Sequence, residues 1–213
     1  PAMHMESFYK SFSMVSQEKF DGLLITGAPV EHLEFEQVDY WDELKEIFNW
    51  TQTNVHSTMA ICWGAMAMMH FFYKIPKYGL NEKAFGCFEH INLVPENRYM
   101  HGFTDRVNVP VSRWSEVRYG DLEKQPNLEV LLSSDQTGPC LIDDKNHNAV
   151  YMINHLEYDT LTLKSEYLRD RSLNKDTVVP KDYFPNDDIA KPPINYWRSH
   201  GHLLYGNWIN EIY

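Results

Sequence analysis

The sequence has only three cysteines, Cys62, Cys87 and Cys140, and their spacing matches no metal-binding motif. An odd and sparse set of cysteines is no disulfide framework and is typical of a protein from the reducing cytoplasm. Apolar runs long enough to cross a membrane are also missing, because the longest, residues 59–73, is interrupted by cysteine, glycine and histidine. The first residues show neither the basic nor the apolar stretch of a signal peptide.

Positive charge is scarce as well, since 19 lysines and arginines against 30 acidic residues give a formal net charge of −11. Such a balance disfavours nucleic acids and anionic membranes as partners, so neither is expected. It still allows a small anionic ligand, which needs only a local basic pocket. With 43% hydrophobic and 14% aromatic residues, the 213-residue chain is typical of one globular domain with a full core.

The first part of the chain alternates between strand and helix patterns. Residues 23–25 form the continuous apolar run of a buried parallel strand, and they lead into a glycine loop at 26–29. An amphipathic helix is expected over 40–54, a strand over 58–61 and a second helix over 64–73. This order predicts an α/β, flavodoxin-like fold with a mostly parallel sheet flanked by helices, and a ligand site at the carboxyl ends of the strands.

The pattern changes in the second part, where short alternating segments separated by turn residues predict an antiparallel portion of the sheet. A helix is then expected over 158–171, with Leu161, Tyr167 and Leu168 on its apolar side. A surface loop over 178–193 and a closing helix over 196–213 follow. The five expected antiparallel strands cover residues 88–93, 107–111, 129–132, 139–143 and 149–153.

Cys62 lies where the strand 58–61 meets the helix that begins at Gly64. A tight strand-to-helix turn presents a side chain as a nucleophile, and the helix N-terminus favours thiolate over thiol. The alternative is a buried structural thiol, which is our interpretation of Cys87 and Cys140. The position at the strand end favours the nucleophile for Cys62.

His155 and Glu157 follow the predicted strand 149–153. Residues two apart in an extended segment point to the same side, so the carboxylate can orient the imidazole. The imidazole can then take a proton from Cys62. The alternative is a strand end with ordinary polar residues, since a lone His-x-Glu is weak evidence.

The glycine loop at 26–29 is a further candidate for chemistry. Its N–H groups at Gly27 and Ala28 can point at a developing oxyanion together with the N–H of Trp63, whereas Pro29 has none to donate. Without the other candidate residues, this loop would be interpreted as an ordinary turn between a strand and a helix. With the cysteine and the histidine, it predicts an enzyme that processes acyl or amide groups. The remaining histidines and the pair Asp187-Asp188 form no recognisable metal set, so no metal is expected.

Several motifs together resemble a known family. Cys62 on its turn with His155-Leu156-Glu157 downstream resembles the class I glutamine amidotransferase-like fold. A more detailed resemblance is to homoserine O-acyltransferases of the MetA family. That family has an N-terminal segment with further strands, and this sequence begins after it, so residues 1–213 are expected to form a single acyltransferase domain without those strands. The matching segments are residues 20–30, 61–64, 155–159, 183–188 and 197–202.

The resemblance implies a reaction in methionine biosynthesis. An acyl group passes from acyl-CoA to Cys62 and then to the hydroxyl of L-homoserine, with His155 as the general base and Glu157 orienting it. It also implies a homodimer and no cofactor beyond the acyl-CoA co-substrate. The family positions that contact substrate correspond to Lys83, Ser112 and Arg169, the last suited to the homoserine carboxylate.

The acyl donor is assigned from Glu31. In the family, glycine at this position is associated with succinyl-CoA and glutamate with acetyl-CoA. A carboxylate in the acyl pocket fills space and repels the succinyl carboxylate, so acetyl-CoA is expected. Alternatively, Glu31 caps or faces solvent at the start of the segment 31–39. Succinyl transfer, a glutaminase-type amidotransferase and a catalytically silent binding module on the same fold remain alternatives.

Overall fold

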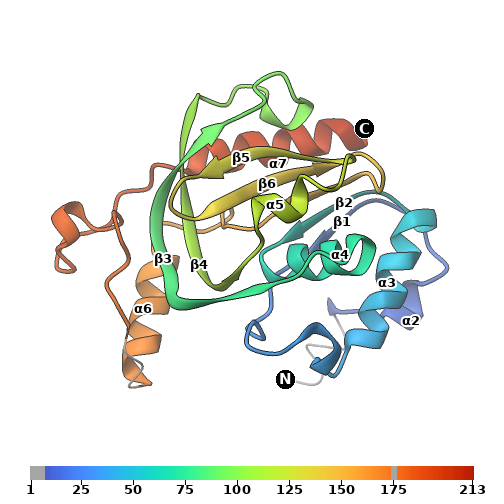
Figure 1. The fold of residues 1–213 in the computed structure, drawn as a ribbon, viewed down its shortest axis with the longest axis horizontal. Helices are drawn as coiled ribbons and strands as arrows, with labels where there is room; N and C mark the ends of the chain where they lie inside the picture. The colour runs from blue at the N-terminus through green and yellow to red at the C-terminus, as the bar shows by residue number, and fades with distance from the viewer. Residues whose placement is uncertain (1–7, 174–176) are drawn as a thin grey trace.

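The computed structural model describes residues 8–173 and 177–213. Seven strands lie within these residues: β1 (Phe20–Ile25), β2 (Val55–Ile61), β3 (Tyr78–Asn92), β4 (Arg106–Glu116), β5 (Leu128–Ser134), β6 (Gly138–Asp144) and β7 (Ala149–Met152). They form one curled sheet in the order β1-β2-β7-β6-β5-β3-β4 (Figure 1). The predicted segments for these strands are confirmed, with β3 and β4 longer than expected.

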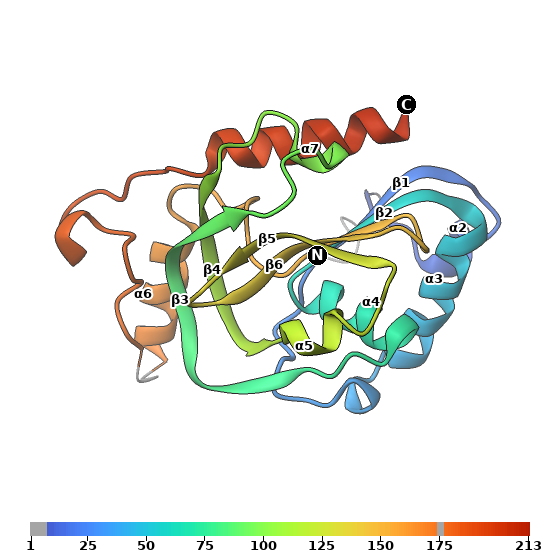
Figure 2. The ribbon, with the colours of Figure 1, turned by 45° about the horizontal axis from the view of Figure 1, so that its top comes forward.

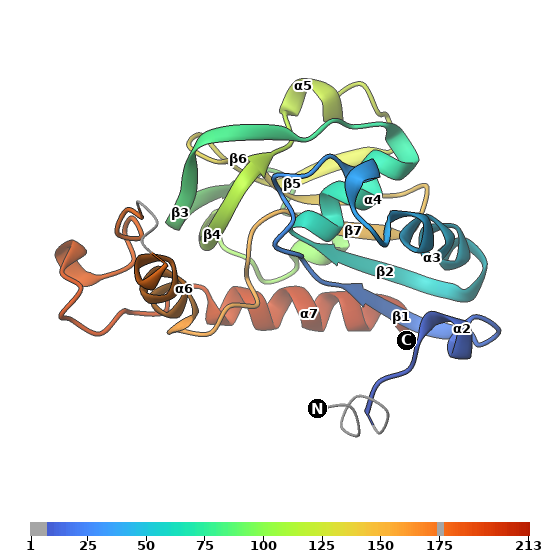
Figure 3. The same cartoon turned by 90° about the horizontal axis from the view of Figure 1, so that it is seen from below.

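Helices cover both faces of this sheet. They are α2 (Phe12–Val15), α3 (Trp41–Asn54), α4 (Trp63–Tyr73), α5 (Tyr119–Leu122), α6 (Thr162–Ser172) and α7 (Arg198–Ile212), with short 3₁₀ helices η1 (Phe35–Gln37), η2 (Arg98–Met100) and η3 (Pro185–Asp187). Figures 2 and 3 show α3 and α4 on one face and α7 on the other, while α6 stands beside the ends of β3 and β4. No helix in 8–173 or 177–213 combines the length and apolar character that a membrane span requires.

The core has two halves because side chains alternate across the central strands. In β2, Met59 and Ile61 join the apolar cluster that includes Trp208 of α7. Ala60 joins the other cluster, with Phe48 of α3 and the buried methionines of α4. A strand covered on both faces is apolar at successive positions, which explains the unbroken apolar run that the sequence shows here.

The predicted α/β fold with an antiparallel portion is confirmed, but the sheet is mixed rather than mostly parallel. Of the six strand pairings between described residues, only β1–β2 and β2–β7 are parallel. Parallel neighbours need a long crossover, which α3 supplies between β1 and β2. From β3 to β7 the connections contain no long helix, so the chain reverses from strand to strand.

Two predicted details are corrected by the packing. The strand containing Leu24 was expected to be buried, but β1 is the edge strand of the described sheet and Leu24 is 39% exposed. The helix expected from residue 158 begins at Thr162, because residues 155–161 form turns. The later start changes the buried face, so Leu161 and Leu168 are exposed and Leu163 packs into the core. Tyr167 is buried, as expected.

Candidate active site

Cys62 lies at the junction of β2 and α4, with φ 53° and ψ −121°. Its N–H donates to the carbonyl of Met152 (2.7 Å), and its own carbonyl accepts from the N–H of Met66 (3.1 Å). A positive φ is costly for a residue with a Cβ and persists where the surroundings determine it. The predicted elbow is therefore confirmed, with the thiol at the N-terminus of a buried helix.

Gly64 allows α4 to begin this close to β1. A Cβ at this position would lie 2.8 Å from the carbonyl oxygen of Thr26 and 3.0 Å from Cγ2 of Ile25. Since backbone cannot move aside cheaply, we expect Gly64→Ala to lower the free energy of unfolding by about 1–3 kcal/mol, measured by denaturant titration. Gly206→Ala in α7 is the control, because a Cβ there meets no atom within 4 Å. Equal stability of Gly64→Ala and wild type would contradict the close approach.

His155 is held in place by three different contacts. Its Nδ1–H donates to Oε1 of Glu157 at 2.6 Å, which is the predicted pairing. Its ring stacks on Tyr158, with centroids 4.2 Å apart and an interplanar angle of 19°. Its backbone N–H donates to the carbonyl of Pro110 on β4 (2.9 Å). The imidazole therefore has one orientation, in which Nε2 is left for chemistry.

The charge state of His155 follows from its neighbours. Nε2 is buried and has no hydrogen-bond partner of normal geometry in the described part of the chain. Burial disfavours the imidazolium, but the sulfur of Cys62 and the carboxylate of Glu157 outweigh it and raise the pKa of His155 to about 10. His155 is thus a cation at neutral pH, and a cation beside a cysteine stabilises its thiolate.

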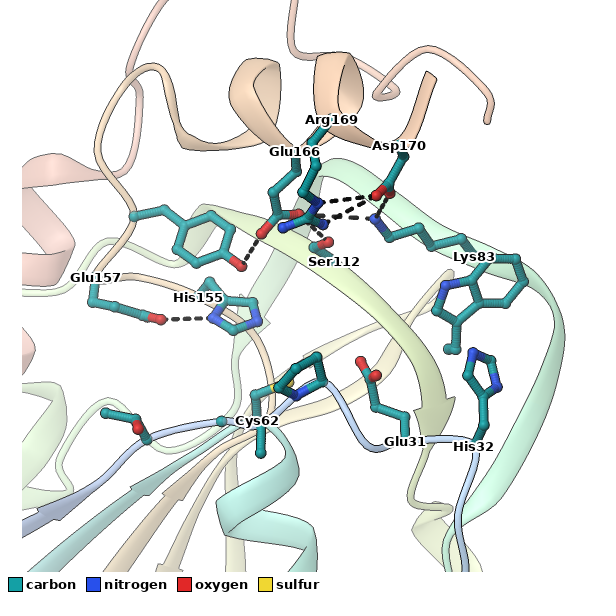
Figure 4. A pocket seen from close by; sticks show the side chains of 16 residues that line it. Glu31, His32, Cys62, Lys83, Ser112, His155, Glu157, Glu166, Arg169 and Asp170 are labelled. Carbon is teal, nitrogen blue, oxygen red and sulfur yellow. Dashed lines mark hydrogen bonds and ion pairs between the residues drawn. The ribbon is translucent and has the colours of Figure 1, made fainter. Parts of the chain in front are cut away.

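Cys62 and His155 lie in the wall of a cavity of about 480 Å³ (Figure 4). A cavity of this size suits a small molecule. The loop at 26–32 forms one side, and α6 with parts of β3 and β4 forms the other. Of the residues predicted for the site, those that line this cavity are Gly27, Ala28, Glu31, Cys62, Lys83, Ser112, His155, Glu157 and Arg169.

The candidate oxyanion loop lies directly beside the thiol. A Cβ on Gly27 would be 3.1 Å from Cβ and 3.7 Å from Sγ of Cys62, so glycine keeps the space around the sulfur open. Trp63 does not line the cavity, because its side chain is 2% exposed and packs against Phe35. Only its backbone N–H, the first of α4, is available. The structure brings these residues together, and their use on an oxyanion stays a prediction.

Glu31 faces the cavity and caps no helix. The nearby 3₁₀ helix η1 is capped by Glu34 through a reciprocal capping box, which contradicts the alternative of Glu31 as a cap. Nζ of Lys77 donates to the carbonyls of Glu31 (2.7 Å) and Leu33 (2.9 Å), and so fixes the backbone of this loop. The half-buried carboxylate is thereby presented to the site from the same side as Cys62.

A charged cluster lies across the cavity from Cys62 (Figure 4). Nζ of Lys83 is 3.0 Å from Oδ2 of Asp170, and Arg169 donates to Oδ1 of the same carboxylate at 3.1 and 3.2 Å. Burial raises the pKa of Asp170, but these two cations together hold it below its ordinary value. Arg169 is 61% exposed at its side chain, so its guanidinium is open to a ligand at the cavity rim.

Sequence reasoning missed several residues of this cavity wall, among them Glu166, Tyr158 and Asp170. Glu166 accepts hydrogen bonds from Ser112 and from Tyr158 (2.7 Å), and its Oε2 lies 3.8 Å from Nζ of Lys83. One signal was available, because residues 166, 169 and 170 share a helix face by their spacing of three and four. Tyr158 had no such signal beyond its closeness to His155.

The other two cysteines have no part in the cavity. Cys87 and Cys140 are free and buried, and burial raises the pKa of both thiols to about 12. Their interpretation as structural thiols is confirmed, because a thiol that does not ionise is a poor nucleophile. Among the described residues, no group of three or more histidines, cysteines or carboxylates is arranged to hold a metal ion.

Comparisons with known proteins agree on one family. A profile of the family described as homoserine O-succinyltransferase matches residues 1–213. Two relatives named homoserine O-acetyltransferase, from Cereibacter sphaeroides and Roseobacter denitrificans, are 57% and 56% identical over 212 residues, which is 100% of this chain and 70% of each relative.

Solved structures confirm the predicted glutamine amidotransferase-like fold. A glutamine amidotransferase from Thermotoga maritima has a TM-score of 0.63 and 14% identity, covering 89% of this chain and 77% of that one. Another, from Methylobacillus flagellatus, has a TM-score of 0.61 and 12% identity, covering 89% and 76%. At this identity the likeness concerns the fold alone.

Proposed function

Because this chain belongs to the homoserine O-succinyltransferase family, we propose that it transfers an acetyl group from acetyl-CoA to the hydroxyl of L-homoserine. One observation supports the chemistry above all others: Cys62 on its strained turn faces a cationic His155 that is bonded to Glu157, all in one cavity. The acetyl group is the finer part of the proposal. It is supported by Glu31 in the same cavity and by the names of the two relatives.

The first half-reaction loads the acetyl group onto Cys62. The thiolate attacks the carbonyl carbon of acetyl-CoA, with the oxyanion held by backbone N–H groups of Trp63 and the loop at 26–29. A bond forms between carbon and the sulfur of Cys62 while the bond to the CoA sulfur breaks. The CoA thiolate leaves with the proton of His155, which becomes neutral. Its raised pKa means that this proton is present before the donor arrives.

The second half-reaction passes the acetyl group to homoserine. Neutral His155 accepts the hydroxyl proton at Nε2 while the hydroxyl oxygen attacks the thioester. The new ester bond forms, the bond to Cys62 breaks, and thiolate and imidazolium are restored. Neither half changes an oxidation state, and the N–H groups stabilise the charge, so the proposal needs no metal or redox cofactor.

Homoserine is a zwitterion, and the wall opposite Cys62 carries both signs of charge. The guanidinium of Arg169 can bind the carboxylate through two parallel hydrogen bonds. Glu166, accepting from Ser112 and Tyr158, offers a carboxylate to the ammonium group. Lys83 neutralises the acidic side of the cluster. We therefore assign Arg169 and Glu166 to the two ends of the amino acid, so that its hydroxyl points at Cys62.

The acyl preference is the test of Glu31. We expect Glu31→Gly to shift the ratio of kcat/KM for acetyl-CoA over succinyl-CoA by about 10–100-fold toward succinyl, because space opens and a repulsive charge is lost. Glu31→Gln is the matched variant, since it removes the charge and keeps the volume. It should shift the ratio less. An unchanged ratio of kcat/KM in both variants would show that Glu31 does not determine which acyl group is accepted.

Turnover assays test the function itself. Purified protein with L-homoserine is given acetyl-CoA or succinyl-CoA, and the O-acylhomoserine formed is measured by chromatography. We expect kcat/KM to be at least about tenfold higher for acetyl-CoA than for succinyl-CoA, which is the discrimination that a single altered contact typically provides. Preferred succinyl transfer would overturn the donor, and release of ammonia from glutamine would favour the amidotransferase alternative.

The proposal places the protein in methionine biosynthesis in the cytoplasm, as a homodimer. The pathway and the dimer rest on the family resemblance, and the compartment on the sparse cysteines. Sedimentation of the purified protein measures the assembly.

A further inference from the structure

A buried arginine lies behind the candidate active site without a carboxylate partner. Arg113 follows Ser112 on β4 and is 1% exposed. Successive strand residues point to opposite faces, so Ser112 lines the cavity and Arg113 does not. None of the ion pairs within 8–173 and 177–213 includes Arg113. A buried guanidinium without a counter-ion costs several kcal/mol, so its presence needs a physical reason.

Each of the three guanidinium nitrogens of Arg113 donates a hydrogen bond to a neutral oxygen atom. Nε donates to Oδ1 of Asn154 (3.0 Å), and Nη1 donates to the carbonyl of Ser115 (2.8 Å). Nη2 donates to the carbonyl of Thr137. These partners come from β4 itself, from the turn before β6 and from the segment after β7. One side chain therefore ties three separate parts of the chain together.

His90 determines which way the amide of Asn154 points. Nδ1 of His90 lies 2.8 Å from the carbonyl of Phe88, so this nitrogen must carry the proton and donate. Burial, with the charge of Arg113 nearby, lowers the pKa of His90 to about 4, so the ring stays neutral. Nε2 is then an acceptor and takes a hydrogen bond from Nδ2 of Asn154 (2.9 Å). Oδ1 of Asn154 is left to face Arg113.

Asn154 immediately precedes His155, in a segment whose backbone is hydrogen-bonded to Cys62, to β6 and to β4. The carbonyl of Met152 accepts from the N–H of Cys62 (2.7 Å), and the N–H of Ile153 donates to the backbone carbonyl of Cys140 (2.7 Å). The N–H of His155 donates to Pro110 on β4 (2.9 Å). β4 thus holds this segment twice, by a backbone bond at His155 and by the Arg113 fork at Asn154.

We infer that Arg113, Asn154 and His90 are positioning residues for the pair of Cys62 and His155. Their hydrogen bonds fix the segment between β7 and His155 in one conformation, so that Nε2 of the imidazole meets the sulfur. The inference rests on the proposed function, since it concerns the same nucleophile. None of the three residues lines the cavity, so they act through Cys62 and His155 and not on substrate.

The same arrangement explains how the buried charge of Arg113 is tolerated. Burial lowers the pKa of its guanidinium, and the neighbouring groups Cys62, Glu116 and Cys140 act against this effect. A cation fixed behind the cavity wall favours negative charge inside the cavity without occupying space that a substrate needs.

Three substitutions test the network. Arg113→Met removes the fork and the charge, Arg113→Lys keeps the charge without the fork, and Asn154→Asp keeps the shape but places an acceptor against Nε2 of His90. The control is Arg118→Met, an exposed arginine outside the cavity that pairs with Glu116. Each protein is checked for folding by circular dichroism, then measured for kcat, KM, alkylation of Cys62 by iodoacetamide, and His90 titration by NMR.

We expect Arg113→Met to lower kcat by about 100-fold with KM within about threefold, since misplacement of a catalytic group by about 1 Å has this effect. The kcat of Arg113→Lys should lie between those of Arg113→Met and wild type. Asn154→Asp should move the pKa of His90 from about 4 toward its ordinary value of 6.5. Arg118→Met should match wild type throughout.

Two results would overturn the inference: a folded Arg113→Met with wild-type kcat and Cys62 alkylation, or an Asn154→Asp in which His90 titrates as in wild type. If Arg113→Met does not fold, the isosteric Asn154→Asp still decides the matter. Alkylation and NMR need no homoserine or CoA, so a failure of the proposed reaction is seen separately from a failure of this network.

Discussion

Cys62→Ala is expected to abolish acyl transfer, with kcat/KM lower by roughly 10⁴-fold or more, as for other enzymes that lose a covalent nucleophile. The thiol forms the intermediate in the proposed reaction, and no neighbouring group in the cavity replaces it. With acetyl-CoA alone, the intact mass of wild type should increase by one acetyl group. Cys62→Ala should show no such increase.

The two buried cysteines supply an internal control for this experiment. Peptide mapping should find the acetyl group on Cys62, while Cys87 and Cys140 stay unmodified because burial keeps their thiols protonated. An acetyl adduct that persists at full level in Cys62→Ala would refute the proposed intermediate. Acetylation of wild type at a lysine alone would do the same.

His155→Gln should have the second largest effect, a loss of about 10³-fold in kcat, typical of a removed general acid–base residue. Glutamine fills similar space but cannot exchange the proton in either half-reaction. The reactivity of Cys62 toward iodoacetamide at neutral pH should fall as well, because the neighbouring cation is gone. Steady-state kinetics and alkylation rates measure the two losses independently.

The pH dependence of this variant has a definite sign. His155 in wild type has a pKa of about 10, so its positive charge is present at neutral pH and is lost as the pH rises through that value. The ratio of alkylation rates, wild type over His155→Gln, should therefore be largest near neutrality and approach one above pH 10. A ratio independent of pH would show that His155 does not act on Cys62 through its charge.

Glu157→Gln separates orientation from charge in the same pair. The amide can still lie against Nδ1 of His155, but it removes the carboxylate that helps to raise the pKa of the imidazole. We expect a loss in kcat of about 10–100-fold, smaller than for His155→Gln. A loss as large as that of His155→Gln would mean that Glu157 takes part in the proton transfers itself.

Local features of this protein were predictable because their causes are local. The turn at Cys62 follows from an apolar strand, a small residue at Gly64 and a helix pattern directly behind them, and the structure has this turn. The pairing of His155 with Glu157 follows from the two-residue period of extended chain. The strands and long helices followed from hydrophobic periodicity, apart from the late start of α6 at Thr162.

Contacts between distant segments were beyond sequence reasoning. Lys83 pairs with Asp170 across 87 positions, and Ser112 bonds Glu166 across 54. Neither pair shares a periodic pattern, because their closeness depends on the curl of the sheet that brings β3 and β4 beside α6. The excess of antiparallel pairings has the same origin, since strand order depends on all connections at once.

By itself, the sequence located the proposed nucleophile Cys62, its proposed base His155 and the loop beside them, and it determined the α/β fold class. Only the tertiary structure decided the cavity's opposite wall, with Glu166, Tyr158 and Asp170, and the buried network at Arg113. The physical reason is that dihedral preferences and hydrophobic period act between neighbours in the chain. Charge pairing and burial act between neighbours in space, and these are known only when the sheet has curled and closed around the site.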